Sequence, residues 1–255
     1  MIPVVDGLDA FGPAAVAGCL IVIYLVVGEP VAGAVLHRRF EAALGHDPGA
    51  RGWLYRRLLA LEWGLAALAG GVVLVAPEVG WGELGLRWPD RAPGVLAIAL
   101  AVFVIAVLVL TTGMVRTSAR TDPQDASLNV LGSPSVTALV PRTPMERRWF
   151  ALVSVTAGFC EELLYRGLLL AVVVAIVPGA GDLALVLVSA VAFGLAHAYQ
   201  GPTGVVATGV LGAILAYLYV GTGTLLLPMV VHAVIDLRIL WLPRHLLPPD
   251  RAVPA

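Results

Sequence analysis

The chain has 255 residues, of which 59% are hydrophobic and only 13% are charged, with a formal net charge of −1. A soluble domain usually has about 45–50% apolar and about 25% charged residues, so this chain has too few polar residues to cover a water-facing surface. Together with only two cysteines, this composition excludes a disordered chain, a secreted disulfide scaffold and a nucleic-acid-binding protein. We therefore predict a polytopic protein embedded in the lipid bilayer.

Seven apolar runs are candidates for membrane spans, because a hydrocarbon core about 30 Å thick needs about 20 apolar residues per helix. The runs cover residues 11–36, 54–77, 92–115, 149–177, 183–199, 204–220 and 225–243. They are continuous and lack the alternating pattern of barrel strands. We predict an all-α transmembrane helical bundle with seven spans; the alternative is an eighth span or a short interfacial helix within residues 37–57.

The placement of arginine predicts the orientation of the bundle. The segments 37–57 and 116–148 hold five arginines each, whereas residues 78–91 hold two and residues 1–10 hold none. Loops rich in arginine or lysine stay in the cytoplasm. We therefore predict a multi-pass protein of the cell membrane with its N-terminus outside and its C-terminus in the cytoplasm.

A polar stretch divides the chain into regions. Residues 116–148 include a run of Thr, Ser, Pro, Asp and Asn, which is typical of a flexible linker. We predict an N-terminal three-span region (1–115), a cytoplasmic linker (116–148), a C-terminal four-span catalytic core (149–243) and a cytoplasmic tail (244–255). The chemistry is expected in the C-terminal core, because most of the ionisable residues at membrane depth lie there.

Charged side chains at the centre of a membrane cost about 2.5–3.5 kcal/mol each on insertion scales, so they mark functional sites. Nine ionisable residues lie at membrane depth, namely Glu29, Glu62, Glu161, Glu162, Arg166, His197, His232, Asp236 and Arg238. Six of them form three short groups in the C-terminal core. We expect these groups to carry the function.

The first group is the pair Glu161 and Glu162, followed by Arg166. On a helix, Glu162 and Arg166 are one turn apart and can form an ion pair. Glu161 points about 100° away from Glu162. It is therefore left for general acid or base chemistry.

The other two groups are His197, near the end of the fifth span, and His232 with Asp236 in the seventh. The four-residue spacing places His232 and Asp236 on one helix face, where the carboxylate can orient the imidazole or share a ligand with it. Each group alone also fits a structural hydrogen bond. Together, carboxylates and histidines from three helices indicate a site that activates water, either with a metal or by metal-free acid–base catalysis.

These groups resemble the motifs of the CAAX protease and bacteriocin-processing family of intramembrane endopeptidases (CPBP, or Abi), which includes the type II CAAX prenyl endopeptidases. The family shows E-E-x-x-x-R, then F-x-x-x-H, then H-x-x-x-N. The matching residues are Glu161, Glu162 and Arg166, then Phe193 and His197, then His232 and Asp236. The resemblance covers residues 143–240, together with Leu84–Arg87.

The resemblance implies a role for each residue. Glu161 with His197 would activate the hydrolytic water, and His232 with the residue at 236 would stabilise the oxyanion. Asp236 departs from the family's asparagine, and an ionised carboxylate would repel an oxyanion. Asp236 must therefore be protonated, orient His232, or ligate a metal. We expect no obligatory cofactor; the alternative is a metalloprotease with zinc held by Glu161, His197 and His232.

The favoured function is thus an intramembrane protease that hydrolyses a membrane-proximal peptide or protein substrate. A proton-coupled transporter is one alternative, with Glu29 and Glu62 as further stations for the proton. A non-catalytic membrane scaffold of the same family is the other. For the protease, we expect one cavity that joins the fourth, fifth and seventh spans and opens to the cytoplasm.

Overall fold

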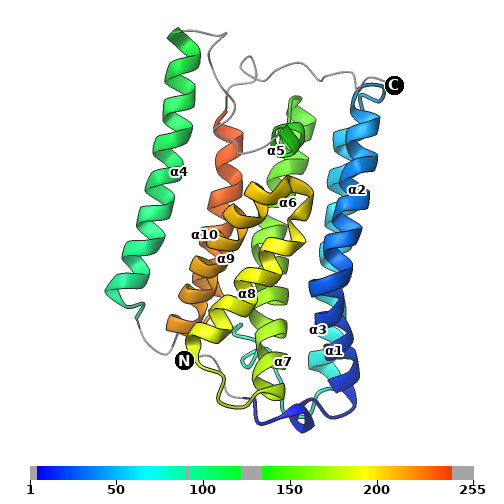
Figure 1. The fold of residues 1–255 in the computed structure, drawn as a ribbon, viewed down its shortest axis with the longest axis vertical. Coiled ribbons are helices and arrows are strands. Elements are labelled where there is room, and N and C mark those ends of the chain that lie inside the picture. Colours follow the sequence, from blue (N-terminus) through cyan, green and yellow to red (C-terminus); the bar gives the residue numbers. More distant parts are fainter. Residues whose placement is uncertain (1–4, 90–91, 122–133, 243–255) are drawn as a thin grey trace.

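The computed structural model describes residues 5–89, 92–121 and 134–242, and its elements in these ranges are helices (Figure 1). The N-terminal half contains η1 (Leu8–Ala14), α1 (Ala15–Ile23), η2 (Tyr24–Gly28), α2 (Glu29–Leu44), α3 (Ala50–Val75) and α4 (Val95–Thr121). The remainder contains α5 (Pro134–Leu139), α6 (Pro144–Glu162), η4 (Leu163–Leu168), α7 (Leu169–Ile176), α8 (Asp182–Ala196), η5 (Ala198–Gln200), α9 (Gly201–Thr222), α10 (Leu226–Leu237) and η6 (Arg238–Trp241). The predicted all-α helical membrane bundle is confirmed.

Helices occupy all seven predicted runs, but among the described residues only four helical segments have the length and apolar character of a membrane span. These four are Leu8–Leu44, Ala50–Val75, Val95–Met114 and Ala198–Thr222. The helix formed by α6, η4 and α7 is long but carries the Glu161–Glu162–Arg166 group. The other two, α8 and α10, have only 15 and 12 residues. Both short helices bury one face inside the bundle, and α8 exposes its other face through Leu183, Leu187 and Val191.

The predicted boundaries of the first connecting loop were wrong. The segment 37–57 is mostly helical, since α2 continues to Leu44 and α3 begins at Ala50. Only a short turn of residues 45–49 connects the two helices. Alanine, leucine and arginine favour helix in water as well as in lipid, so the helices continue past the apolar runs.

The segment 134–148 is also more ordered than a flexible linker. Arg51 donates from Nε to the Ala138 carbonyl at 2.9 Å, and the Tyr55 hydroxyl donates to the Leu139 carbonyl at 2.6 Å. Helix α6 then starts five residues before the predicted 149, because Thr143 caps it in a reciprocal capping box with Glu146. At its other end the predicted linker is also helical, since α4 continues through residues 116–121. Residues 122–133 of the linker and the predicted tail lie outside the described residues.

The arginine-rich segments gather at one end of the bundle. Figure 1 shows the α2–α3 connection, the end of α4, the start of α6 and the end of α10 at the same end. The segment Leu84–Arg87 supports the turn between α9 and α10 instead, because Arg87 donates from Nε to the Gly223 carbonyl at 3.1 Å. The Leu225 amide also donates to the Gly85 carbonyl at 2.9 Å.

Close helix packing positions the two motif helices α6 and α10. A Cβ added to Gly158 of α6 would lie 2.9 Å from Ala233 and 3.0 Å from the Met229 carbonyl of α10. Glycine therefore allows the two backbones to approach closely, as small residues do in membrane bundles. The approach brings the end of α6, with Glu161 and Glu162, beside His232.

Candidate active site

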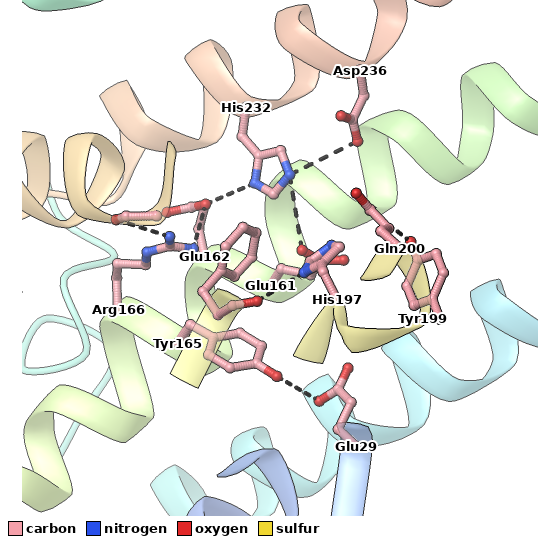
Figure 2. Close-up of polar contacts among 12 residues, drawn as sticks. Glu29, Glu161, Glu162, Tyr165, Arg166, His197, Tyr199, Gln200, His232 and Asp236 are labelled. Atoms are coloured by element: carbon pink, nitrogen blue, oxygen red, sulfur yellow. Dashed lines mark hydrogen bonds and ion pairs between the residues drawn. The ribbon is translucent and has the colours of Figure 1, made fainter. Parts of the chain in front are cut away.

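A buried triad forms the base of the site. Arg166 Nη1 donates to Glu162 Oε1 at 2.9 Å, and His232 Nδ1 lies 2.7 Å from the same oxygen (Figure 2). The side chains of Glu162 and Arg166 are fully buried, and that of His232 is 5% exposed. Because the carboxylate paired with Arg166 accepts hydrogen bonds, His232 Nδ1 is the donor. This fixes His232 with Nε2 directed away from Glu162.

Arg166 is held by more than its ion pair. Its Nη2 donates to the Gly212 carbonyl of α9 at 3.2 Å, and its guanidinium lies 4.3 Å from the centre of the Phe193 ring. A Cβ on Gly212 would lie 3.1 Å from Phe193 and 3.3 Å from Arg166 Nη2, so glycine leaves the space that the arginine needs. Arg166 therefore connects α9 and α8 to η4, which continues α6.

Glu161 lies on the other side of the His232 ring from Glu162, as the helical spacing of the two carboxylates predicted. Its Oε2 lies 3.9 Å from His232 Nε2, too far for a hydrogen bond. That oxygen is buried and has no hydrogen-bond partner among the described residues, although the side chain as a whole is 17% exposed. Glu161 is thus a carboxylate with free acceptor capacity at the surface of the site.

His197 directly follows the last residue of α8 as its C-cap, and a backbone contact orients its ring. Its Nδ1 lies 2.8 Å from the Phe193 carbonyl. A carbonyl oxygen only accepts hydrogen bonds, so Nδ1 carries the proton and Nε2 can accept one. The Phe193 ring packs at 4.7 Å from the His197 ring and at 5.8 Å from the His232 ring, measured between centroids. Phe193 thus packs against both imidazoles.

Asp236 lies on the same face of α10 as His232, as predicted. Its Oδ2 is 3.8 Å from His232 Nε2, and its side chain is 35% exposed. Figure 2 shows Glu161, His197 and Asp236 arranged around the ring of His232. Glu161 and Asp236 therefore both lie within 4 Å of His232, and His197 packs on the Phe193 ring that His232 also contacts.

A cavity of about 520 Å³ adjoins this group. All four predicted catalytic residues line it, and so do Glu29 and Glu62 of the N-terminal half. It extends toward the arginine-rich end, where Tyr55, Leu139 and Phe150 line it. The cavity therefore involves both halves of the chain, whereas the sequence analysis assigned the chemistry to the C-terminal core alone.

Glu29 reaches the site through Tyr165, a residue that the sequence analysis did not single out. The Tyr165 hydroxyl donates to Glu29 Oε2 at 2.8 Å and also lies 3.4 Å from the Leu25 carbonyl. Both η2 and η4 are π-helical turns, which occur often at functional sites. The contact fixes the first helix against the motif helix.

Tyr199 and Gln200 of η5 line the cavity as well, and sequence reasoning missed them. The Gln200 amide donates to the Tyr199 hydroxyl at 3.2 Å. These residues follow His197 directly in the sequence, but polar residues at the end of a span are too common to be a signal. Glu29 and Glu62 did carry a signal, since both are carboxylates within apolar runs.

The described arrangement does not fit a preformed zinc centre. A catalytic zinc site needs three protein ligands at about 2.0–2.2 Å from the metal. Within residues 5–89, 92–121 and 134–242, no three His, Cys, Asp or Glu side chains are grouped closely enough to hold a metal ion. Glu161, His197 and His232 are therefore not gathered as a ligand set in this arrangement.

Comparison with known proteins agrees with the motifs. Residues 144–238 match the family model described as "Type II CAAX prenyl endopeptidase Rce1-like". The matched segment begins at α6, ends at the first residue of η6 and contains all seven motif residues. No curated protein and no solved structure matches the chain significantly. The family match confirms the resemblance to the CAAX proteases and supports a membrane-embedded endopeptidase in general.

Proposed function

We propose that the chain, whose C-terminal region matches the CAAX protease family, is an intramembrane endopeptidase that hydrolyses a membrane-proximal peptide or protein. The observation that carries this proposal is the position of Glu161. Its buried, unpartnered oxygen faces a cavity that His197, His232 and Asp236 also line. A carboxylate and two imidazoles around one space are the groups that peptide hydrolysis by water requires.

Glu161 and His197 are the pair proposed to activate water. A water molecule in the cavity would give one proton to Glu161, and His197 Nε2 can accept a hydrogen bond from its other O–H, because Nδ1 carries the ring proton that is donated to the Phe193 carbonyl. The activated water attacks the scissile carbonyl carbon. The proton that Glu161 takes from the water then passes to the leaving amine, so Glu161 acts first as base and then as acid.

His232 is the proposed oxyanion donor. When its ring carries both protons, Nδ1–H donates to Glu162 and Nε2–H is available to the oxygen that develops negative charge. Asp236, 3.8 Å from Nε2, is proposed to orient and balance this ring rather than to contact the oxyanion. Glu162 and Arg166 are positioning residues, since they hold His232 from its far side.

The experiment that tests the function is peptide cleavage by the purified protein in proteoliposomes. A library of apolar peptides is incubated with wild-type protein and with Glu161→Gln, and the products are identified by mass spectrometry. Cleavage by the wild type alone supports the endopeptidase. Peptides that bind but remain intact would favour a non-catalytic scaffold.

The proposal also includes independence from an obligatory metal, and Asp236→Asn tests it. In a metal-free enzyme this substitution should retain activity within a few-fold, because an asparagine carbonyl can still orient the His232 ring and carries no charge that would repel the oxyanion. If Asp236 served a zinc ion, metal affinity should fall about 10–100-fold. Activity is measured with and without a chelator, alongside elemental analysis of the purified protein. Stoichiometric zinc lost together with activity would contradict the metal-free mechanism.

We further propose that the arginine-rich end is cytoplasmic and that the N-terminus is outside. The arginine-rich segments lie at the same end of the bundle, as the positive-inside rule requires (Figure 1). Single cysteines placed at Asp47, which is exposed, and at position 124, which is outside the described residues, should both react only from the cytoplasmic side. The measurement is labelling with a membrane-impermeant maleimide in Cys19→Ser/Cys160→Ser protein. External labelling at either site would refute this orientation.

A further inference from the structure

Glu62 is a carboxylate in the cavity that the proposed mechanism does not use. It lies on α3, outside the segment that matches the protease family. Its Oε2 is buried and has no hydrogen-bond partner among the described residues. A buried acceptor that remains unpaired is costly, so an unpartnered carboxylate oxygen in a cavity wall is a candidate for ligand binding.

The neighbour of Glu62 fixes α3 against the catalytic helix. Trp63 Nε1 donates to Thr156 Oγ1 of α6 at 3.2 Å, and the Trp63 ring stacks on Phe159 with centroids 5.7 Å apart. Both contacts fall within two turns of Glu161 along α6. Glu62 is therefore held in a defined position relative to the catalytic carboxylate.

The charges that line the cavity are unbalanced. Among the described lining residues there are four acidic side chains, Glu29, Glu62, Glu161 and Asp236, against one arginine, Arg238, and two histidines, of which His232 is proposed to carry a charge. Glu29 accepts from Tyr165, Asp236 faces His232, and Glu161 faces the proposed water. Glu62 is the remaining carboxylate, and most other lining residues are apolar. Such a cavity favours an apolar peptide that carries one positive charge.

We propose that Glu62 is a specificity-determining residue that binds an arginine or lysine side chain of the peptide substrate near the scissile bond. This inference rests on the proposed endopeptidase function and names its substrate class. An arginine or lysine side chain would donate charge-assisted hydrogen bonds to Oε2 and place a positive charge beside Glu62. The same contact would place the scissile carbonyl at a fixed distance from Glu161, since α3 and α6 are fixed to each other.

A binding experiment tests this inference without requiring cleavage. Apolar fluorescent peptides carry one arginine that is moved position by position, and each is paired with a copy holding neutral citrulline. Their affinities are measured by fluorescence anisotropy on the Glu161→Gln protein. For at least one position, the arginine peptide should bind about 10-fold more tightly than its citrulline copy, as a charged hydrogen bond predicts.

Adding Glu62→Gln to this protein should remove the difference between the two peptides. Glu62→Arg should reverse it, so that a glutamate at the same peptide position is preferred, an effect that a purely structural role would not produce. Glu78→Gln is the matched control, because Glu78 is exposed and does not line the cavity. If Glu62→Arg fails to fold, the loss of the arginine preference in Glu62→Gln still tests the proposal, since glutamine keeps the shape of the side chain.

The outcomes separate the two proposals. A wild-type protein that cleaves no peptide but prefers arginine through Glu62 would overturn the endopeptidase and retain the cation site. Cleavage with no arginine preference, or with a preference that survives Glu62→Gln, would overturn the role of Glu62 and retain the endopeptidase.

Discussion

Replacing Glu161 by glutamine should abolish peptide cleavage and leave the fold intact. Glutamine has the shape of glutamate but cannot take a proton from water, and loss of a general base lowers rates by about 10²–10⁴-fold. The fold should tolerate the change because Glu161 makes no hydrogen bond through its buried Oε2. The measurements are the cleavage rate and the thermal midpoint of unfolding in detergent. The midpoint should stay near that of the wild type.

The matched control for this variant is Glu78→Gln, which changes an exposed glutamate and should retain full activity. If Glu161→Gln also kept full activity, the water-activating role would have to move to Glu162. That result would contradict the present assignment, because Glu162 is occupied by Arg166 and His232.

Replacing Arg166 by alanine should cause the largest loss of stability. Its side chain and that of Glu162 are both fully buried, so the substitution leaves a buried carboxylate without its arginine. Breaking a buried ion pair in this way costs about 3–5 kcal/mol. The variant should also lose the contacts of the guanidinium with Gly212 and Phe193. Yield of folded protein and the thermal midpoint are the measurements.

Two further variants give this prediction its controls. Arg38→Ala removes an exposed arginine of α2 and should leave the thermal midpoint near that of the wild type. The double variant Arg166→Met/Glu162→Gln removes both charges and should recover part of the loss, because no unpaired charge remains buried. An Arg166→Ala protein as stable as the wild type would show that the pair is not structural.

The helical bundle could be predicted because apolar runs of span length have few alternatives in lipid. The ends of the elements could not, since helices such as α2 and α6 continue into polar sequence. Thr143 and Glu146 do form a capping box that the sequence contains. Its position inside a presumed linker concealed it. The short α8 and α10 show that the hydropathy of a run does not by itself fix the length of its helix.

Much of the site followed from local spacing. The pair of Glu162 with Arg166 and the shared face of His232 with Asp236 are four-residue relations on one helix, and helix geometry determines both. The bond between Glu162 and His232 joins residues 70 positions apart. It depends on the close approach of α6 and α10, which periodicity does not reveal. Glu162 was therefore predicted as a partner of Arg166 and not as the residue that orients His232.

The contribution of the N-terminal half was the hardest part to predict. Glu29 and Glu62 were recognised as carboxylates at membrane depth, but only as stations of an alternative transporter. Their place in the cavity depends on the packing of α3 against α6 and of α2 against α3, α8 and η5. No sequence pattern within either helix encodes that packing, and Tyr165, which binds Glu29, is one aromatic residue among many in apolar runs.

One measurement tests the central claim most directly, namely that this cavity hydrolyses a peptide bond with water activated by Glu161. The wild-type protein in liposomes is incubated with the peptide library in H₂¹⁸O, and the products are weighed by mass spectrometry. The account predicts paired fragments in which the new carboxyl terminus carries ¹⁸O, and no such fragments with Glu161→Gln. Peptides that remain intact with the wild-type protein, or ¹⁸O-labelled fragments that form equally fast with Glu161→Gln, would contradict it.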